Sequence, residues 1–283
     1  MISFTHYDKV RYEATYRVEP RDLVIEMNGV MDKRSKCGFR GPNIEVKSNI
    51  PSVICGDMFL SGNMYHVACD HLCRAWHFIQ EYDEKVNYIF SKQMWGWSQW
   101  AINKVLEDRR CVNLLEMEKT YNFQNCYVSS NLFRTNSSIP YVSEHHSDYL
   151  FPLREKLTEG VTPICMNKVY ISRKLGKGRS ITNEQQLENK LLERGYFIVC
   201  LEDLTPEEQI GIFMGAKTIV TPHGAALTNM VGRTEGTIYE LRNKEYKVRC
   251  YQSIAEAMDL KMEERNVIYT DRYSIKETLE WVP

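Results

Sequence analysis

The sequence predicts an α/β protein of two domains, with a parallel β-sheet in its second half. From about residue 166, short apolar runs that suit strands alternate with segments that carry helix-capping signals. The chain of 283 residues is long enough for two domains of about 100–150 residues each. Hydrophobic residues make up 43% of it and charged residues 26%, a balance that supports a sizeable core and argues against intrinsic disorder.

In the second half, the elements can be predicted one by one. Four strands are expected, at residues 168–172, 196–201, 218–221 and 237–241. Between the first two, residues 182–185 fit a capping box, and the helix that they open ends at Gly195. Thr205 begins a second helix as its N-cap, with Pro at the first helical position and Glu at the third, and this helix reaches Gly215. A short helix begins at Ala225, after the third strand.

The first half is less regular. Residues 1–55 predict short strands and turns, and apolar residues at three- and four-residue spacing predict helix over residues 63–110. Residues 129–165 are rich in Ser, Asn, Pro and His, and we place the interdomain linker near the end of that stretch. The expected parts are an N-terminal domain, a C-terminal domain and a closing helix, at residues 1–160, 161–265 and 266–283.

Composition and charge exclude several classes of protein. Lys and Arg number 36 against 37 Asp and Glu, a net charge of −1, which argues against general nucleic-acid binding. No stretch approaches the roughly 20 apolar residues of a membrane span, and the polar, charged start does not resemble a signal peptide, so we expect a cytoplasmic protein. Nine cysteines without a CxxC pair argue against a zinc ribbon or a thioredoxin-type site and favour buried free thiols.

Cations and glycines follow the first predicted strand directly. Residues 172–179 (SRKLGKGR) hold four cations and two glycines. Guanidinium groups pair with phosphate oxygens in a bidentate way, and glycines let a backbone approach closely. Because open α/β sheets bind ligands outside the carboxyl ends of their strands, this loop predicts a phosphate site. A solvated basic loop is the alternative interpretation.

A second candidate segment lies after the third strand, where residues 221–229 (TPHGAALTN) open a short helix without an acidic residue. Free N–H groups and the positive end of the helix dipole would suit an anion there. The segment is neither a GxGxxG fingerprint nor a Walker loop, and a capped turn histidine at His223 is the alternative. Glu240 ends the fourth strand, where it either accepts hydrogen bonds from ribose hydroxyls or is a surface charge.

In the first half, Asn63, His66 and Asp70 fall on one face of a predicted helix. A His and an Asp one turn apart in an apolar helix suit proton transfer, while a structural hydrogen-bonded pair and half of a metal site stay open. Three tryptophans cluster within residues 95–100. They suit either a stacking platform for an acceptor sugar or, with more weight, a core or interface cluster.

At these residues the sequence resembles the inverting glycosyltransferases of family 61. The segments that carry the resemblance, in the order and spacing of the family, are residues 63–70, 170–184, 202–230 and 238–241. The resemblance covers about residues 55–245 and implies the GT-B architecture, two Rossmann-like domains that face a cleft, with a UDP-linked sugar as the usual donor. In GT-B proteins a C-terminal helix often crosses back to the first domain, a place that the predicted helix at 272–281 would take here.

The resemblance and the residues agree on a metal-independent reaction. No Asp-x-Asp pair, which metal-dependent transferases commonly use to hold a divalent ion, occurs in the sequence, and neither a metal nor another cofactor is expected. The catalytic residues expected are Asp70, as general base, and His66 beside it. The residues expected to bind the nucleotide are Arg173, Lys174, Arg179, Asn183, Glu202, Asp203, Leu204, His223, Gly224, Ala225, Ala226, Asn229 and Glu240.

The resemblance also implies the substrates. The expected reaction moves xylose from UDP-xylose to a hydroxyl of a glycan or glycoprotein, with inversion to a β-linkage. The alternatives are UDP-N-acetylglucosamine or UDP-arabinose as donor, and a nucleotide-sugar-binding module without catalysis. Plant and animal members carry a membrane anchor or signal sequence that this chain does not show, so it resembles a cytoplasmic microbial or virus-encoded xylosyltransferase.

Overall fold

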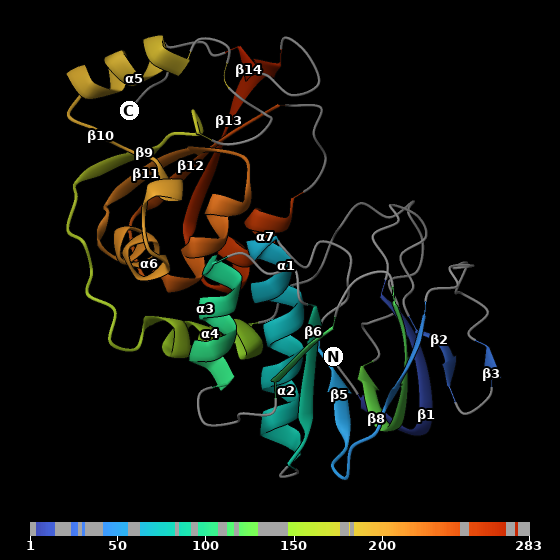
Figure 1. Cartoon of the computed structure of the whole chain (residues 1–283). Helices are drawn as coiled ribbons and strands as arrows, with labels where there is room; N and C mark the ends of the chain where they lie inside the picture. The colour runs from blue at the N-terminus through green and yellow to red at the C-terminus, as the bar shows by residue number, and fades with distance from the viewer. Residues whose placement is uncertain are drawn as a thin grey trace. The chain divides into compact units, whose positions relative to one another are not determined.

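The computed structural model divides the chain into two compact units, Met1–Ser138 and Ile139–Pro283 (Figure 1). The residues that it describes are 4–14, 24–27, 30–31, 42–55, 63–82, 85–91, 96–106, 112–115, 119–129, 147–175, 181, 184–243, 249–269 and 275–276. No helix in this described part is long and apolar enough to cross a membrane.

The first unit is built on a mixed eight-stranded sheet. Its elements in chain order are β1 (Phe4–Ala14), β2 (Val24–Met27), β3 (Val30–Met31), β4 (Asn43–Val46), β5 (Ser52–Ile54), α1 (Met64–His66), η1 (Val67–Leu72), α2 (Cys73–Glu81), β6 (Asn87–Ser91), α3 (Gly96–Leu106), β7 (Val112–Leu115) and β8 (Lys119–Ser129). The strand order is β3-β2-β1-β8-β5-β6-β7, with β4 beside β8.

Within that sheet, β8, β5, β6 and β7 are parallel neighbours, whereas β1 pairs antiparallel with both β2 and β8. After β5 the chain adds β6 and β7 on one side and then returns to place β8 on the other. This reversal is the topological switch of a Rossmann-like sheet, and the helix that carries His66 and Asp70 follows β5 directly in the chain.

The second unit contains α4 (Ser147–Thr158), β9 (Lys168–Ile171), α5 (Glu184–Glu193), β10 (Phe197–Val199), η3 (Leu201–Asp203), α6 (Pro206–Gly215), β11 (Thr218–Pro222), η4 (Ala225–Gly232), β12 (Thr237–Asn243), α7 (Cys250–Ala257), β13 (Lys261–Tyr269) and β14 (Ile275–Lys276). Its strand order is β10-β9-β11-β12-β13-β14. The first five of these strands are parallel, as the alternation of strands and helices predicts, and β14 is antiparallel to β13.

The predicted caps of the second unit are confirmed wherever the structure describes them. Thr205 and Glu208 form a reciprocal capping box at the start of α6, with Pro206 in the first turn. The backbone at Gly195 is left-handed (φ 79°), a conformation in which glycine carries no steric cost, and it ends the turn after α5. The capping box predicted at residues 182–185 includes Thr182 and Asn183, which lie outside the described residues.

Three expectations differ from the structure. Residues 63–110 are not all helical, because β6 (Asn87–Ser91) lies between α2 and α3; its short apolar run is one whose periodicity does not separate strand from helix. The units divide at residue 138, not near 160, because α4 contacts η4, α6 and α7 of the second unit. Of the predicted closing helix at 272–281, the described residues Ile275 and Lys276 form the strand β14.

The cysteines are mostly buried thiols, as the composition suggests. Of the nine, seven lie among the described residues and all seven are free. Cys55, Cys69, Cys73, Cys126 and Cys250 are buried, Cys200 is half-buried and Cys165 is exposed.

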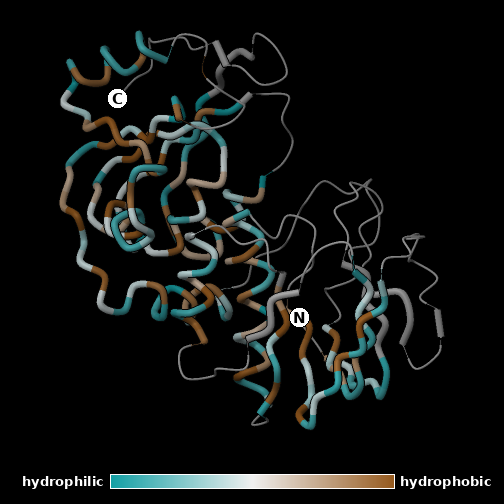
Figure 2. Tube along the Cα trace, viewed as in Figure 1, coloured by the Kyte–Doolittle hydropathy of each residue, from teal (hydrophilic) through white to brown (hydrophobic). Residues whose placement is uncertain are grey.

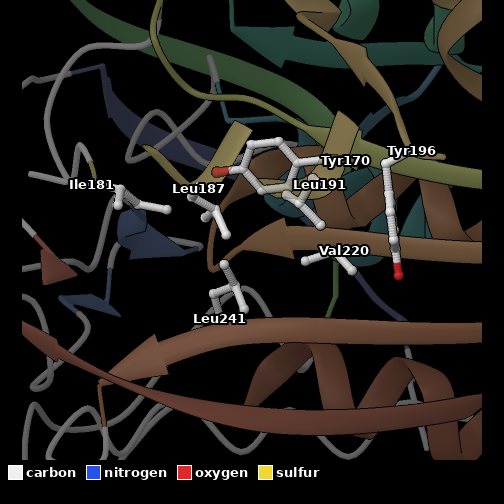
Figure 3. Packing of buried hydrophobic residues seen from close by; sticks show 7 residues of the cluster. All are labelled: Tyr170, Ile181, Leu187, Leu191, Tyr196, Val220 and Leu241. Atoms are coloured by element: carbon white, nitrogen blue, oxygen red, sulfur yellow. The ribbon is translucent and has the colours of Figure 1, made fainter. Parts of the chain in front are cut away.

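The sheet of the second unit packs its core against α5 (Figure 3). Hydrophobic and hydrophilic residues alternate along this helix, as a helix that covers one face of a sheet requires (Figure 2). The buried cluster consists of Tyr170, Ile181, Leu187, Leu191, Tyr196, Val220 and Leu241. It joins β9, β11 and β12, so the strands whose ends carry the candidate residues share one core.

We predict that replacing Leu187 with Ala lowers the free energy of unfolding of the second unit by about 2–5 kcal/mol, because it leaves a cavity in this cluster. Leu187 is completely buried, whereas Leu192 on the same helix is 55% exposed. Leu192→Ala is therefore the matched control and should change stability little. Urea unfolding of the three proteins measures the difference, and equal losses for both variants would contradict the assigned core.

Candidate functional site

The strongest candidate site lies at the carboxyl ends of the parallel strands in the second unit. From β9 the chain moves outward to β10 and then returns to place β11 on the other side of β9. The chain therefore diverges in opposite directions from the ends of β9 and β11, which is where open α/β sheets bind ligands. Arg173 follows β9 and His223 follows β11, so these two of the predicted binding residues flank this switch point.

Arg173 joins the two strand ends. Its Nη1 donates a hydrogen bond of 3.1 Å to the backbone carbonyl of His223. The guanidinium lies across Gly224, and a Cβ atom added there would overlap Nη1. The absence of a side chain at Gly224 is thus what lets the cation reach the neighbouring strand end. This close approach explains why a glycine follows His223.

A buried carboxylate that the prediction did not include holds the backbone at Arg173. Glu184, the first residue of α5, accepts three hydrogen bonds at its Oε1 atom. The donors are the Tyr170 hydroxyl at 3.1 Å, the Ser172 hydroxyl at 3.0 Å and the Arg173 backbone N–H at 2.9 Å. Its position inside a capping-box pattern marked it in the sequence only as a helix-start residue.

His223 is oriented by a second buried carboxylate. Its Nδ1 atom pairs with Oε1 of Glu240, and both side chains are almost completely buried. The His223 ring also meets the ring of Tyr251 edge to face, with centroids 5.1 Å apart. The bond from Nδ1 to the carboxylate fixes the orientation of the imidazole ring. Glu240 is thus a buried partner of His223 and not a surface charge.

The charge of Glu240 is balanced by further polar groups. Nη1 of Arg242 lies 3.7 Å from Oε2 of Glu240 and 2.8 Å from Oε1 of Glu264. The same Nη1 donates to the Gln252 side chain at 3.2 Å. Burial, followed by the charge of Glu240, raises the pKa of the nearby Cys250 thiol to about 12, so this thiol is protonated at neutral pH.

The turn after β11 presents backbone amides. The N–H of Leu227 donates to the carbonyl of Gly224 at 3.0 Å and closes the first turn of η4. The preceding amides of Ala225 and Ala226 have no partner within that turn, as the first N–H groups of a helix do not. Asn229 is completely buried and donates to the carbonyl of Ala226 at 3.1 Å, so it supports the turn from inside.

The remaining predicted nucleotide-binding residues follow the edge strand β10, follow β9 or lie outside the described part. Glu202 and Asp203 are exposed in η3, and the carbonyl of the half-buried Leu204 accepts a bond from Gln209. Lys174 is exposed, and its N–H donates to the Ser172 hydroxyl at 3.3 Å. Arg179 and Asn183 lie outside the described residues.

In the first unit, His66 and Asp70 form a close pair. Nδ1 of His66 and Oδ2 of Asp70 are 2.6 Å apart, and both side chains are buried. Asn63 is the N-cap of this helix, since its side chain accepts a bond from the N–H of Tyr65. Asp70 lies in the π-helical turn Val67–Leu72, a rare conformation that is frequent at functional sites.

Neighbouring groups set the surroundings of this pair. Burial, together with the charge of Asp70, raises the pKa of the Cys73 thiol to about 12. Arg74 is buried and donates to the carbonyl of Cys55 at 3.0 Å, which fixes α2 to the end of β5. No group of three or more potential metal-binding side chains occurs in the part of the chain that the structure describes.

Two of the three clustered tryptophans lie in the described helix α3. Trp97 is buried in α3, and its ring centroid lies 6.0 Å from that of Trp100, which is half-buried. Trp95 lies outside the described residues. A buried Trp97 favours the core interpretation over a stacking platform.

A separate hollow of about 320 Å³ lies along α7 and β13 in the second unit. Its lining residues are Arg249, Gln252, Ala255, Glu256, Leu260, Met262 and Glu264. None of the predicted site residues is among them, although Glu264 and Gln252 bond to Arg242 behind the His223–Glu240 pair.

Comparison with known proteins identifies the family. No curated protein sequence matches the chain. A family model described as Glycosyltransferase 61 matches residues 64–239, more than half of the chain. The match begins at the helix that carries His66 and Asp70 and includes Arg173, His223 and Gly224, so it covers residues of both candidate regions. The chain belongs to glycosyltransferase family 61.

Proposed function

We propose that the protein is an inverting, metal-independent glycosyltransferase that uses a UDP-sugar and a glycan hydroxyl. Membership of the family implies a transferase with a sugar donor and an acceptor. The observation that carries the finer proposal is the bond from Arg173 to the His223 carbonyl across Gly224, at the switch point of a parallel sheet. We further propose the GT-B architecture, which the parallel strands of both sheets support.

The switch point suits the diphosphate of the donor. Arg173 provides a planar cation, and the first amides of η4 provide neutral N–H donors beside it. The nearby carboxylates of Glu184 and Glu240 each have an oxygen engaged by protein donors. Charge-assisted hydrogen bonds of about 1.5–3 kcal/mol each would stabilise the departing UDP as its negative charge develops.

The His66–Asp70 pair suits the acceptor side of the reaction. The carboxylate of Asp70 takes the proton from the acceptor hydroxyl, whose oxygen attacks the anomeric carbon of the donor sugar. The bond from that carbon to the diphosphate breaks, UDP leaves with the electron pair, and the anomeric configuration inverts from α to β. His66 donates from Nδ1 to Asp70 and so orients the carboxylate.

The donor sugar that we propose is xylose, on the resemblance to xylosyltransferases of the family. UDP-N-acetylglucosamine and UDP-arabinose are the alternative donors, and a binding module without catalysis is the alternative function. A turnover screen across the three UDP-sugars, followed by NMR of the product, separates these possibilities, and a chain that turns over none of them is the binding module.

We predict that Gly224→Ala weakens UDP binding about tenfold or more, because the new methyl group moves the Arg173 guanidinium away from the His223 carbonyl. The long arginine side chain can swing aside, so the thermal unfolding midpoint should change little. Arg173→Ala should weaken UDP binding by a similar factor. Gly96→Ala is the control, since a Cβ there meets nothing within 4 Å. Calorimetry with UDP makes the comparison, and wild-type affinity in Gly224→Ala would exclude this arrangement.

Asp70→Asn is predicted to lower the transfer rate by about 10² to 10⁴, because an amide cannot accept the acceptor's proton. The UDP affinity should stay near that of the wild type, since Asp70 is not assigned to the nucleotide. Steady-state kinetics and calorimetry test the two statements separately. Ordinary turnover by the variant would remove Asp70 from the role of base.

Removal of divalent ions is predicted to leave the transfer rate unchanged, because the cationic groups of the protein neutralise the leaving diphosphate and the sequence has no Asp-x-Asp pair. The measurement is the initial rate with and without EDTA. A sharp loss that manganese restores would show that a metal ion takes part.

A further inference from the structure

We propose that Glu184 is a positioning residue that holds Arg173 in place for the donor diphosphate; this inference rests on the proposed function. The sequence prediction placed it only in a capping pattern. The structure instead gathers a core hydroxyl, a strand-end hydroxyl and the Arg173 N–H on one oxygen of its carboxylate.

The three donors lie within four residues of the chain. Tyr170 is in β9 itself, and Ser172 and Arg173 are the first residues beyond its end. Their bonds to one oxygen, all between 2.9 and 3.1 Å, set the direction in which the chain leaves the sheet.

Arg173 is consequently held at its backbone and at the guanidinium end of its side chain. Glu184 binds its backbone N–H at 2.9 Å, and the His223 carbonyl accepts from its Nη1 at 3.1 Å. A long arginine side chain loses much rotamer freedom when it binds a ligand, so a side chain that is already held loses less. Glu184 therefore acts on the diphosphate through Arg173 and not by contact, which its negative charge would make unfavourable.

The helix α5 supplies a matched control. Glu188 lies one turn after Glu184, is also buried, and within the described structure has no hydrogen-bond partner at Oε1. Glu188→Gln removes the charge of a buried carboxylate on the same helix. It leaves the hydrogen bond between Glu184 and the Arg173 backbone in place. Glu188→Gln should thus bind UDP with wild-type affinity.

The test is a double-mutant cycle between Glu184 and Arg173, read as the UDP dissociation constant from calorimetry. Glu184→Ala is expected to raise the constant about tenfold, in the range of one charge-assisted bond. In an Arg173→Ala background the same substitution is expected to have no further effect. Glu184→Gln, whose amide oxygen still accepts hydrogen bonds, should recover part of the loss.

The outcomes separate this inference from the proposed function. If Arg173→Ala binds UDP normally, the proposed diphosphate site itself fails. If Arg173→Ala weakens binding but Glu184→Ala does not, or if the two losses multiply in the double variant, Glu184 does not act through Arg173. Where thermal unfolding finds Glu184→Ala unfolded, Glu184→Gln takes its place in the cycle. In that case, a small loss of UDP affinity in Glu184→Gln that disappears in the Arg173→Ala background supports the inference. Unchanged UDP affinity in Glu184→Gln overturns it.

Discussion

The hydrogen bond from Arg173 to the carbonyl of His223 is the contact on which the candidate donor site depends. It crosses from the end of β9 to the end of β11, the two strands between which the chain reverses direction. It also requires Gly224, because a side chain there would occupy the position of the guanidinium. One cation, one carbonyl and one missing side chain together place positive charge and backbone amides at the same point of the sheet.

Two buried carboxylates lie near the candidate site, where each would repel an anionic ligand that contacted it. Glu184 and Glu240 avoid this because each bonds to the protein group that it holds, Glu184 to the Arg173 backbone and Glu240 to the His223 ring. Arg242 further offsets the charge of Glu240 from behind. The two carboxylates therefore position the groups that they bind, as carboxylates beside metal-binding histidines orient those rings.

Particular elements illustrate what local sequence could predict. The capping box of α6 and the glycine stop after α5 were predictable because a cap involves groups only a few residues apart. Helix α4 was not predicted, because it lies in a stretch rich in Ser, Asn, Pro and His. Strand β6 was not predicted either, because it is a short apolar run without a distinctive period. The role of Glu184 was equally hidden, because its three donors lie 11 to 14 residues earlier and meet it only after the sheet has formed.

The sequence by itself determined the residue types at the strand ends, the pairing of His66 with Asp70 on one helix, and the resemblance that the family match confirms. Only the tertiary structure decided which strand ends are neighbours, that Glu240 faces His223, and that Arg173 lies across Gly224. The physical reason is the range of the interactions. Caps and helix faces are set by spacing along the chain, whereas strand order follows from how whole sheets and helices bury their apolar faces together.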